Sequence, residues 1–169
     1  TVNNTGATVD VGTGAFTVGV MSVSAGGFTQ SGDNGANTQS VASLGVTGGS
    51  VSWGAGSLAF SGALTQSGGT VTLGAKTVTG LSELSMSGAA TVSDLGSADI
   101  SVSGPVTFTS EGRTTTGDAS IVRMGADAAV TIGTVGLNNL EVGAAVTVGG
   151  AGAGPDVNAL TFTGGSLAV

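Results

Sequence analysis

Glycine recurs along this chain with a period of about 20 residues, and this period constrains the fold more than any other feature. The first glycine landmarks, at positions 26, 48, 68 and 88, are almost evenly spaced, and later ones keep the spacing more loosely. A fixed period of this length is typical of stacked repeats, in which each repeat packs on its neighbours. The landmarks are Gly26-Gly27, Gly48-Gly49, Gly68-Gly69, Gly88, Gly104, Gly125, Gly143 and Gly164.

Between the glycines, apolar residues alternate with Ser and Thr in very short runs, as in LTQSGGTVTLGAKTVTG (64–80). Alternation with a period of two, rich in β-branched residues and bounded by Gly, Asn, Asp or Ser, predicts short β-strands. The strand centres are spaced so that three strands complete one glycine period. The predicted centres include Val71, Val78, Leu84, Val92, Ile100 and Val106.

Together these patterns predict an all-β fold: a right-handed parallel β-helix with three faces, about 20 residues per coil and about eight coils. Alternate side chains stack inside, where a narrow interior leaves little room for large aromatics, and glycine supplies the positive φ of tight corners. A β-sandwich or jelly roll is the alternative, although sandwiches usually have longer strands. We expect one domain over residues 1–169, with 26–169 as the repeat body and 1–25 as a first coil or exchanged strand.

Composition argues against several classes of function. Only 8% of the residues are charged, the net charge is -7, and Lys76, Arg113 and Arg123 are the only basic residues. The chain therefore lacks the basic face that nucleic-acid binding requires. It contains no His and no Cys, which removes imidazole, thiolate and ordinary zinc chemistry. No run approaches the length of a membrane-spanning helix, so we expect no membrane insertion. Because His and Cys are absent, we also expect no cofactor, no metal and no catalytic residue.

The ten carboxylates are dispersed along the chain. Asp94 and Asp99 come closest to a pair, but without a basic partner cluster they do not predict a glycosidic site. Corner residues that form Asx turns are the favoured interpretation. The loops 31–37 and 149–160 each contain one carboxylate, Asp33 and Asp156, and neither matches the repeated pattern of calcium-binding rolls.

Thr-x-Thr pairs at 70–72, 77–79, 107–109 and 161–163 suggest a comparison with ice-binding solenoids. A flat ice-binding face needs such pairs in register, one coil apart. The first two pairs fall on adjacent faces, and the others do not continue either column at the period of the repeat. Trp53 and the five Phe residues are scattered, which favours packing over a sugar-binding platform. An ice- or glycan-binding solenoid is therefore the least favoured of the binding and structural functions.

The stretch LTQSGGTVTLGAKTVTGLSELSMSGAATVSDLG (64–96) and the final LTFTGGSLAV (160–169) share a Gly-Gly-x-Val/Leu-x-Val/Leu pattern. In this the chain resembles the β-helical shafts of secreted bacterial surface proteins, namely filamentous-haemagglutinin-like adhesins and autotransporter passengers. The resemblance covers most of the chain from about Gly26 onward. It implies a secreted β-solenoid outside the cell or at its surface, with a role in adhesion or biofilm formation. The chain starts at Thr1, which we expect to follow a removed leader.

Both ends of the sequence are nearly free of charge and contain no capping helix. Residues 1–20 contain one carboxylate, Asp10, and residues 160–169 contain none. Uncovered solenoid ends expose unpaired strand edges, which pair readily with identical edges. We therefore expect a structural subunit of an extracellular filament that assembles head to tail with itself, with host or neighbouring-cell surfaces as further candidate partners. A shaft segment of a larger adhesin or passenger is the alternative. The residues predicted at the polymer interface are Val9, Val11, Phe16, Val18, Leu160, Phe162 and Leu167.

Overall fold

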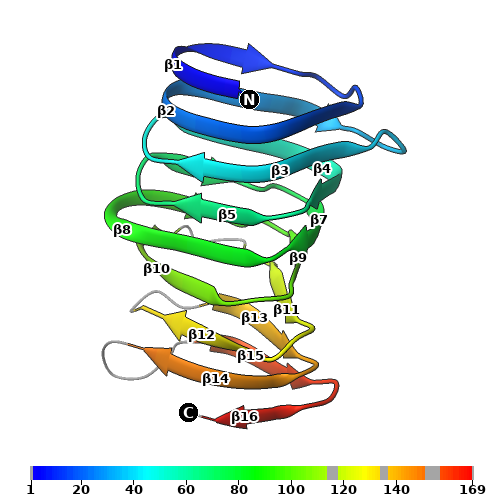
Figure 1. Ribbon diagram of the computed structural model, residues 1–169, viewed down its shortest axis with the longest axis vertical. Coiled ribbons are helices and arrows are strands. Elements are labelled where there is room, and N and C mark those ends of the chain that lie inside the picture. The colour runs from blue at the N-terminus through cyan, green and yellow to red at the C-terminus, as the bar shows by residue number, and fades with distance from the viewer. Residues whose placement is uncertain (1, 114–117, 134–136, 151–156, 169) are drawn as a thin grey trace.

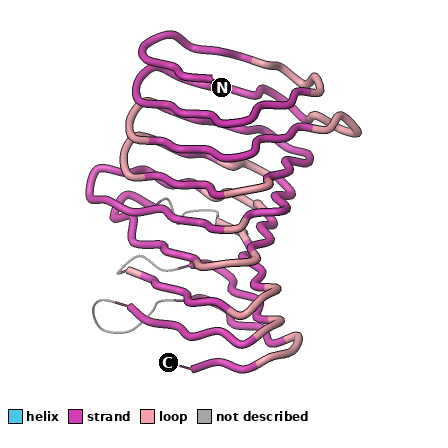
Figure 2. Tube along the Cα trace, viewed as in Figure 1, coloured by secondary structure: helices cyan, strands magenta, loops and turns pink. Residues whose placement is uncertain are grey.

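The chain winds into a single rod of stacked coils (Figure 1). The computed structural model describes residues 2–113, 118–133, 137–150 and 157–168, which form sixteen β-strands in one sheet. Every strand pairing among these residues is parallel. Figure 2 shows strands and loops only. The described residues contain no helix that could cross a membrane. The predicted parallel β-solenoid is confirmed.

The described strands form three faces, each a ladder of strands stacked one coil apart, and the third ladder is described only as far as β10. Longer strands bend from one face to the next. Face A contains the start of β2 (Phe16–Asp33), the start of β3 (Gln39–Val46), the end of β4 (Ser50–Phe60), β7 (Lys76–Leu81), β9 (Asp99–Val102), β11 (Ile121–Met124), β13 (Leu137–Val142) and β15 (Val157–Phe162).

Face B runs across the front of Figure 1. It contains the start of β1 (Val2–Asp10), the middle of β2, the end of β3, β5 (Ala63–Gln66), the start of β8 (Glu83–Asp94), β10 (Val106–Arg113), β12 (Ala128–Ile132), β14 (Ala145–Gly150) and β16 (Ser166–Ala168). Face C contains the ends of β1 and β2, the start of β4, β6 (Thr70–Thr72), and the ends of β8 and β10.

Strand register fixes the length of the repeat. On face A, eight paired positions follow one another through seven turns, the shortest step running from Val122 to Leu140 and the longest from Phe16 to Gln39. The predicted period is confirmed, and the number of turns is close to the eight coils expected. The positions are Phe16, Gln39, Leu58, Val78, Ile100, Val122, Leu140 and Leu160.

Stacked glycines make the corner between faces B and C. Gly26, Gly49 and Gly69 have φ values of 72°, 66° and 66°, in the left-handed region that favours glycine. A Cβ atom on Gly69 would lie 2.4 Å from the carbonyl oxygen of Gly49, so the corners also stack too closely for any side chain. The strands end on either side of Gly49 and Gly69, but β2 continues through Gly26 for 18 residues, and β8 continues through Gly88 for 12. The sequence predicts separate short strands at both of these places.

Inward-facing side chains form one apolar core along the described rod. The core is more aromatic than its narrow interior led us to expect, because aromatic rings from successive coils stack. The Phe28 ring lies 5.9 Å from that of Phe16 and 5.8 Å from that of Trp53, and Trp53 is only 2% exposed. These contacts agree with the prediction that the aromatic residues serve packing.

The strand predicted around Val92 is confirmed as the end of β8, but Val92 does not face the core. Val92 faces solvent on face C and is 41% exposed, whereas the neighbouring Ser93 is fully buried. The Ser93 hydroxyl donates a hydrogen bond to Oε1 of the buried Gln66, at 2.8 Å. This interior hydrogen bond allows a serine to take the inward position, which alternation of apolar residues could not reveal.

Candidate functional site

Apolar side chains are exposed at the N-terminal end of the rod. Val9 in β1 is 40% exposed, although its register partner one coil further in, Phe28, is 2% exposed. Val11, Phe16 and Val18 are partly buried against the core. The four residues predicted for this end therefore all belong to the outermost coil, and Val9 is the most open of them.

The C-terminal end repeats this arrangement. Leu160 and Phe162 in β15 are 41% and 52% exposed, whereas their register partners Leu140 and Val142 in β13 are almost completely buried. Leu167 lies in β16, but its side chain is outside the described residues. The two sets of predicted interface residues lie at opposite ends of the rod (Figure 1), so within one molecule they do not form a single site.

The interior between faces C and A holds a buried lysine. Lys76, at the start of β7, is 1% exposed, and its Nζ donates to Asn34 Oδ1 at 2.5 Å, to the Ala55 carbonyl oxygen at 2.7 Å and to Gln39 Oε1 at 3.2 Å. Burial lowers the pKa of Lys76 to about 8, against the attraction of the Asp33 carboxylate. Three oxygens match the three donors of an ammonium group, so the site satisfies this cation without a ligand.

Sequence reasoning missed this polar cluster. Lys76 stands two residues before the inward-facing Val78, so strand alternation alone places it inside. Asn34 is positioned by its own side chain, whose Nδ2 donates to the carbonyl oxygens of Asn37, at 2.5 Å, and Ser57, at 3.1 Å. The alternation of β7 therefore already indicates that Lys76 faces inward, a position that the sequence analysis did not assign to it.

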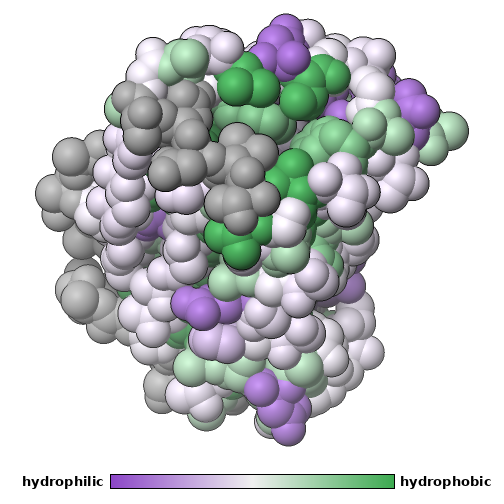
Figure 3. Space-filling model, turned by 45° about the horizontal axis from the view of Figure 1, so that its top comes forward, coloured by the Kyte–Doolittle hydropathy of each residue, from purple (hydrophilic) through white to green (hydrophobic). Residues whose placement is uncertain are grey.

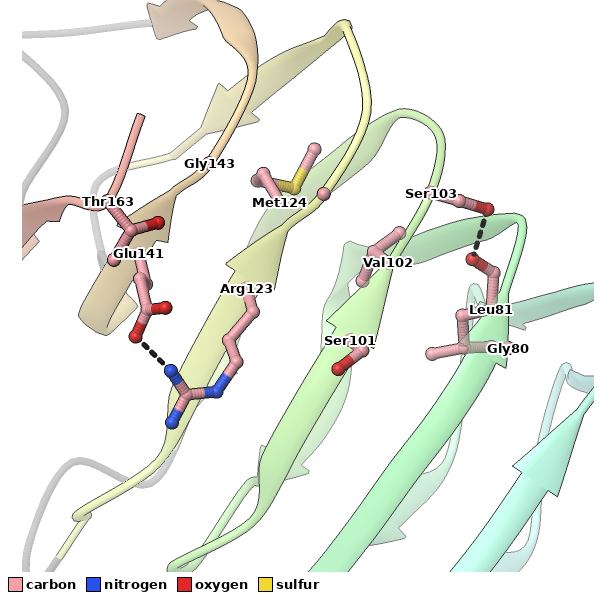
Figure 4. Close-up of a pocket in the computed structure, with 11 residues that line it drawn as sticks. Gly80, Leu81, Ser101, Val102, Ser103, Arg123, Met124, Glu141, Gly143 and Thr163 are labelled. Carbon is pink, nitrogen blue, oxygen red and sulfur yellow. Dashed lines mark hydrogen bonds and ion pairs between the residues drawn. The ribbon is translucent and has the colours of Figure 1, made fainter. Parts of the chain in front are cut away.

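A groove follows the corner between faces A and B on the lower half of the rod (Figure 4). Its volume is about 310 Å³, and its lining includes Ser101, Arg123, Glu141 and Thr163. A second groove of about 330 Å³ follows the same corner higher up, beside Val18, and small residues line much of both. The corner is thus hollowed at two levels of the solenoid.

Arg123 is the main charged group of the lower groove, and two carboxylates already engage it. Its Nε lies 2.7 Å from Asp99 Oδ1 and its Nη2 lies 3.0 Å from Asp99 Oδ2, while Nη1 pairs with Glu141. Hydrogen bonds to Asp99 are the main reason that the pKa of Arg123 is raised. The arrangement offers a neutralised guanidinium and hydroxyl groups, and no activated nucleophile among the residues that line the groove.

Several of the other carboxylates shape corners. Asp10, Asp33 and Asp94 each accept a hydrogen bond from the backbone N–H two residues later, the geometry of an Asx turn. The hydrogen bond from Gly12 holds the pKa of Asp10 below its ordinary value. No group of three or more His, Cys, Asp or Glu residues suited to a metal occurs in the described parts of the chain. Asp156 lies outside those residues.

We compared the chain with models of protein families, with curated proteins and with solved structures, and none of them matches it.

Proposed function

We propose that this chain is a structural subunit that extends into an extracellular filament by stacking its terminal coils on those of further copies. The observation that carries the proposal is the contrast along two inward-facing columns. Leu160 and Val9 are about two-fifths exposed, yet their partners Leu140 and Phe28, one coil further in, are buried. One additional coil at each end would bury these side chains in the same way.

Unpaired strand edges would add to the stability of the same contact between copies. The outer edges of β1 and β15 present backbone N–H and C=O groups that have no neighbouring strand among the described residues. Burying an aliphatic or aromatic side chain contributes ~1.5–3 kcal/mol, and pairing a strand edge satisfies a row of polar groups at the same time. Because the top of one copy contacts the bottom of the next, the contact is heterologous and propagates without closing.

The chemistry of the chain supports a structural role over an enzymatic one. The sequence has no His or Cys, the buried Lys76 is held by three oxygens, and Arg123 is held by two carboxylates. The sequence resemblance to secreted adhesin shafts favours an extracellular or cell-surface location and a role in adhesion. A shaft within a longer polypeptide remains the second candidate, because its continuing coils would cover the same two edges.

The test is electron microscopy of the purified chain at rising concentration, with two variants matched in exposure. Leu160→Lys places a charge in the terminal coil, and Val92→Lys places one on the side wall at the same exposed fraction of 41%. We expect filaments from the wild type and from Val92→Lys, and dispersed monomers from Leu160→Lys. A wild-type chain that stays monomeric at high concentration would sink the proposal.

A further inference from the structure

Face B carries two parallel columns of small, mostly hydroxyl-bearing side chains on its outer surface. Successive members of the first column are register partners from β2 to β12. Each member of the second column lies two residues after a member of the first column, with one inward-facing residue between them. We call this surface the hydroxyl face: Ser22, Gly45, Thr65, Ser85, Thr107 and Thr131 in one column, and Ser24, Thr47, Ser67, Ser87 and Thr109 in the other.

Sequence reasoning missed this array because it counted only Thr-x-Thr pairs. Thr107-x-Thr109 has no Thr-x-Thr pair one coil away, but the register places Ser85 beside Thr107 and Ser87 beside Thr109. Thr65 in turn pairs with Ser85. When Ser and Thr are treated as equivalent, the hydroxyl pairs are continuous over several coils.

The hydroxyl face contains no charged residue, although the chain has a net charge of -7. Asp99 and Glu141 project from face A, and Asp94 stands at the end of β8 on face C. Glu83 belongs to a neighbouring column of face B, two residues before Ser85. The visible wall in Figure 3 is accordingly pale over most of its described surface, with few strongly hydrophilic residues.

We propose that the hydroxyl face packs against the same face of a second copy, so that neighbouring filaments associate side by side. The inference rests on the filament proposed above. Two molecules with excess negative charge repel each other least where their contact surfaces are uncharged. Short Ser, Thr and Gly side chains allow two sheets to approach closely, and hydroxyls can hydrogen-bond across the contact.

The size of the face explains why the contact depends on the filament. Six coils at ~4.8 Å each give a strip about 29 Å long, and its two columns lie ~6.6 Å apart. Such a strip covers only about 200 Å² per copy, well below the ~800 Å² of a stable binary interface. A filament presents the strip repeatedly, and linked weak contacts act together. Lateral association is therefore expected between filaments and not between monomers.

A second copy fits this face better than an ice or polysaccharide surface. The spacing along the columns is that of the solenoid itself, so two copies match in register without adjustment. The two columns contain no aromatic side chain for stacking on sugar rings, and Gly45 interrupts the hydroxyl array that an ice surface would contact. Only the second copy uses both the small residues and the lack of charge.

The experiment compares bundling of filaments by electron microscopy and light scattering. The double variant Thr65→Glu/Thr131→Glu adds charge to two exposed positions of the hydroxyl face, and Ser57→Glu/Thr79→Glu adds the same charge to exposed positions of face A. We expect bundles from the wild type and the face A variant, and single filaments of unchanged length from the hydroxyl-face variant.

Four results would overturn the proposal, and they are distinguishable. Single wild-type filaments, or bundles that persist in the hydroxyl-face variant, contradict lateral packing while leaving the filament intact. Absence of any filament contradicts the proposed function, and lateral packing with it. Monomers that bind ice or crystalline cellulose, and lose that binding in Thr65→Glu/Thr131→Glu, would assign the face to a different partner.

Discussion

The upper coils of this solenoid enclose the ammonium group of Lys76, whereas the lower coils hold the guanidinium group of Arg123 on the outer wall. Lys76 is buried and meets three neutral oxygens, two of them from side chains of the β2–β3 corner and the start of β3. Arg123 lies on face A between Asp99 and Glu141 and keeps about a third of its side chain exposed. Both side chains bridge neighbouring strands, so the same ladder of strands can hold a cation either inside the core or on its surface.

The difference follows from what each region can offer the charge. A buried ammonium group loses its hydration and needs oxygen atoms at fixed positions, which only an interior with polar side chains and free carbonyl oxygens provides. Gln30, Asn34, Gln39 and Gln66 make the upper interior polar enough for this, whereas Ser120 is the only buried polar residue among the described residues after Ser93. In the lower coils, where the described interior is apolar, Arg123, Asp99 and Glu141 keep a quarter or more of their side chains in contact with water.

The largest effect is expected from Trp53→Ala, which removes the widest side chain of the upper core. Trp53 is 2% exposed and packs on Phe28, so its loss leaves a cavity that the rigid coils fill poorly. We expect ~3–5 kcal/mol less stability, measured by chemical denaturation. Phe162→Ala in the dispersed protein is the control, because that side chain is 52% exposed and should matter far less. Equal losses would show that the terminal coil is as well packed as the upper core.

Gly69→Ala tests the corner of the upper coils. The substitution forces a side chain into φ 66° and places its Cβ 2.4 Å from the Gly49 oxygen. We expect a loss of ~3 kcal/mol from backbone strain and the displaced corner, visible as a lower melting temperature. The matched control is Gly125→Ala in the lower coils, where a Cβ meets nothing within 4 Å. A Gly69→Ala protein as stable as the control would contradict a close-packed glycine corner.

The buried lysine predicts that stability depends on pH in one window. Its pKa is lowered to about 8 in the folded chain from about 10.5, so the folded state binds fewer protons than the unfolded state between these values. Stability should therefore rise by on the order of 2 kcal/mol as pH increases from 8 to 10.5, and stay level above that. The chain has no Tyr, Cys or His and no second Lys, so no other side chain titrates there.

Denaturation midpoints across that range check this prediction, and Lys76→Met should abolish the slope whatever its effect on stability at neutral pH. A wild-type profile that is flat from pH 8 to 10.5 would mean that Lys76 is not held as an ammonium group away from water.

The smallest effect is expected at the outer ion pairs. Arg123→Met removes two partly exposed contacts, and such pairs contribute ~0–1 kcal/mol each. The loss should be larger in low salt than in high salt, because ions screen exposed charges. Denaturation at two ionic strengths measures it. A loss as large as that of Gly69→Ala, or one insensitive to salt, would remove the contrast between the two regions.

Sequence reasoning predicted the solenoid because the glycine corners and the strand period are local features that repeat. It could not show that Ser93 rather than Val92 faces inward, because alternation of apolar residues does not reveal that Gln66 hydrogen-bonds a buried serine. The hydroxyl face and the Lys76 site depend on which residues become neighbours one or two coils away. The sequence distance between such neighbours differs from coil to coil on face A, so register could not be fixed from an average period.

The direction of the backbone hydrogen bonds has a mechanical consequence. In a solenoid these bonds run along the rod, from each coil to the next, so a pull on the two ends loads the coil junctions in series. Such a rod yields first at its weakest junction, and the remaining junctions keep their strength. The junctions between β3, β4 and β7 are reinforced from inside, because Lys76 reaches past Ala55 to Asn34 and Gln39. Under tension, this protein should open elsewhere before it opens there.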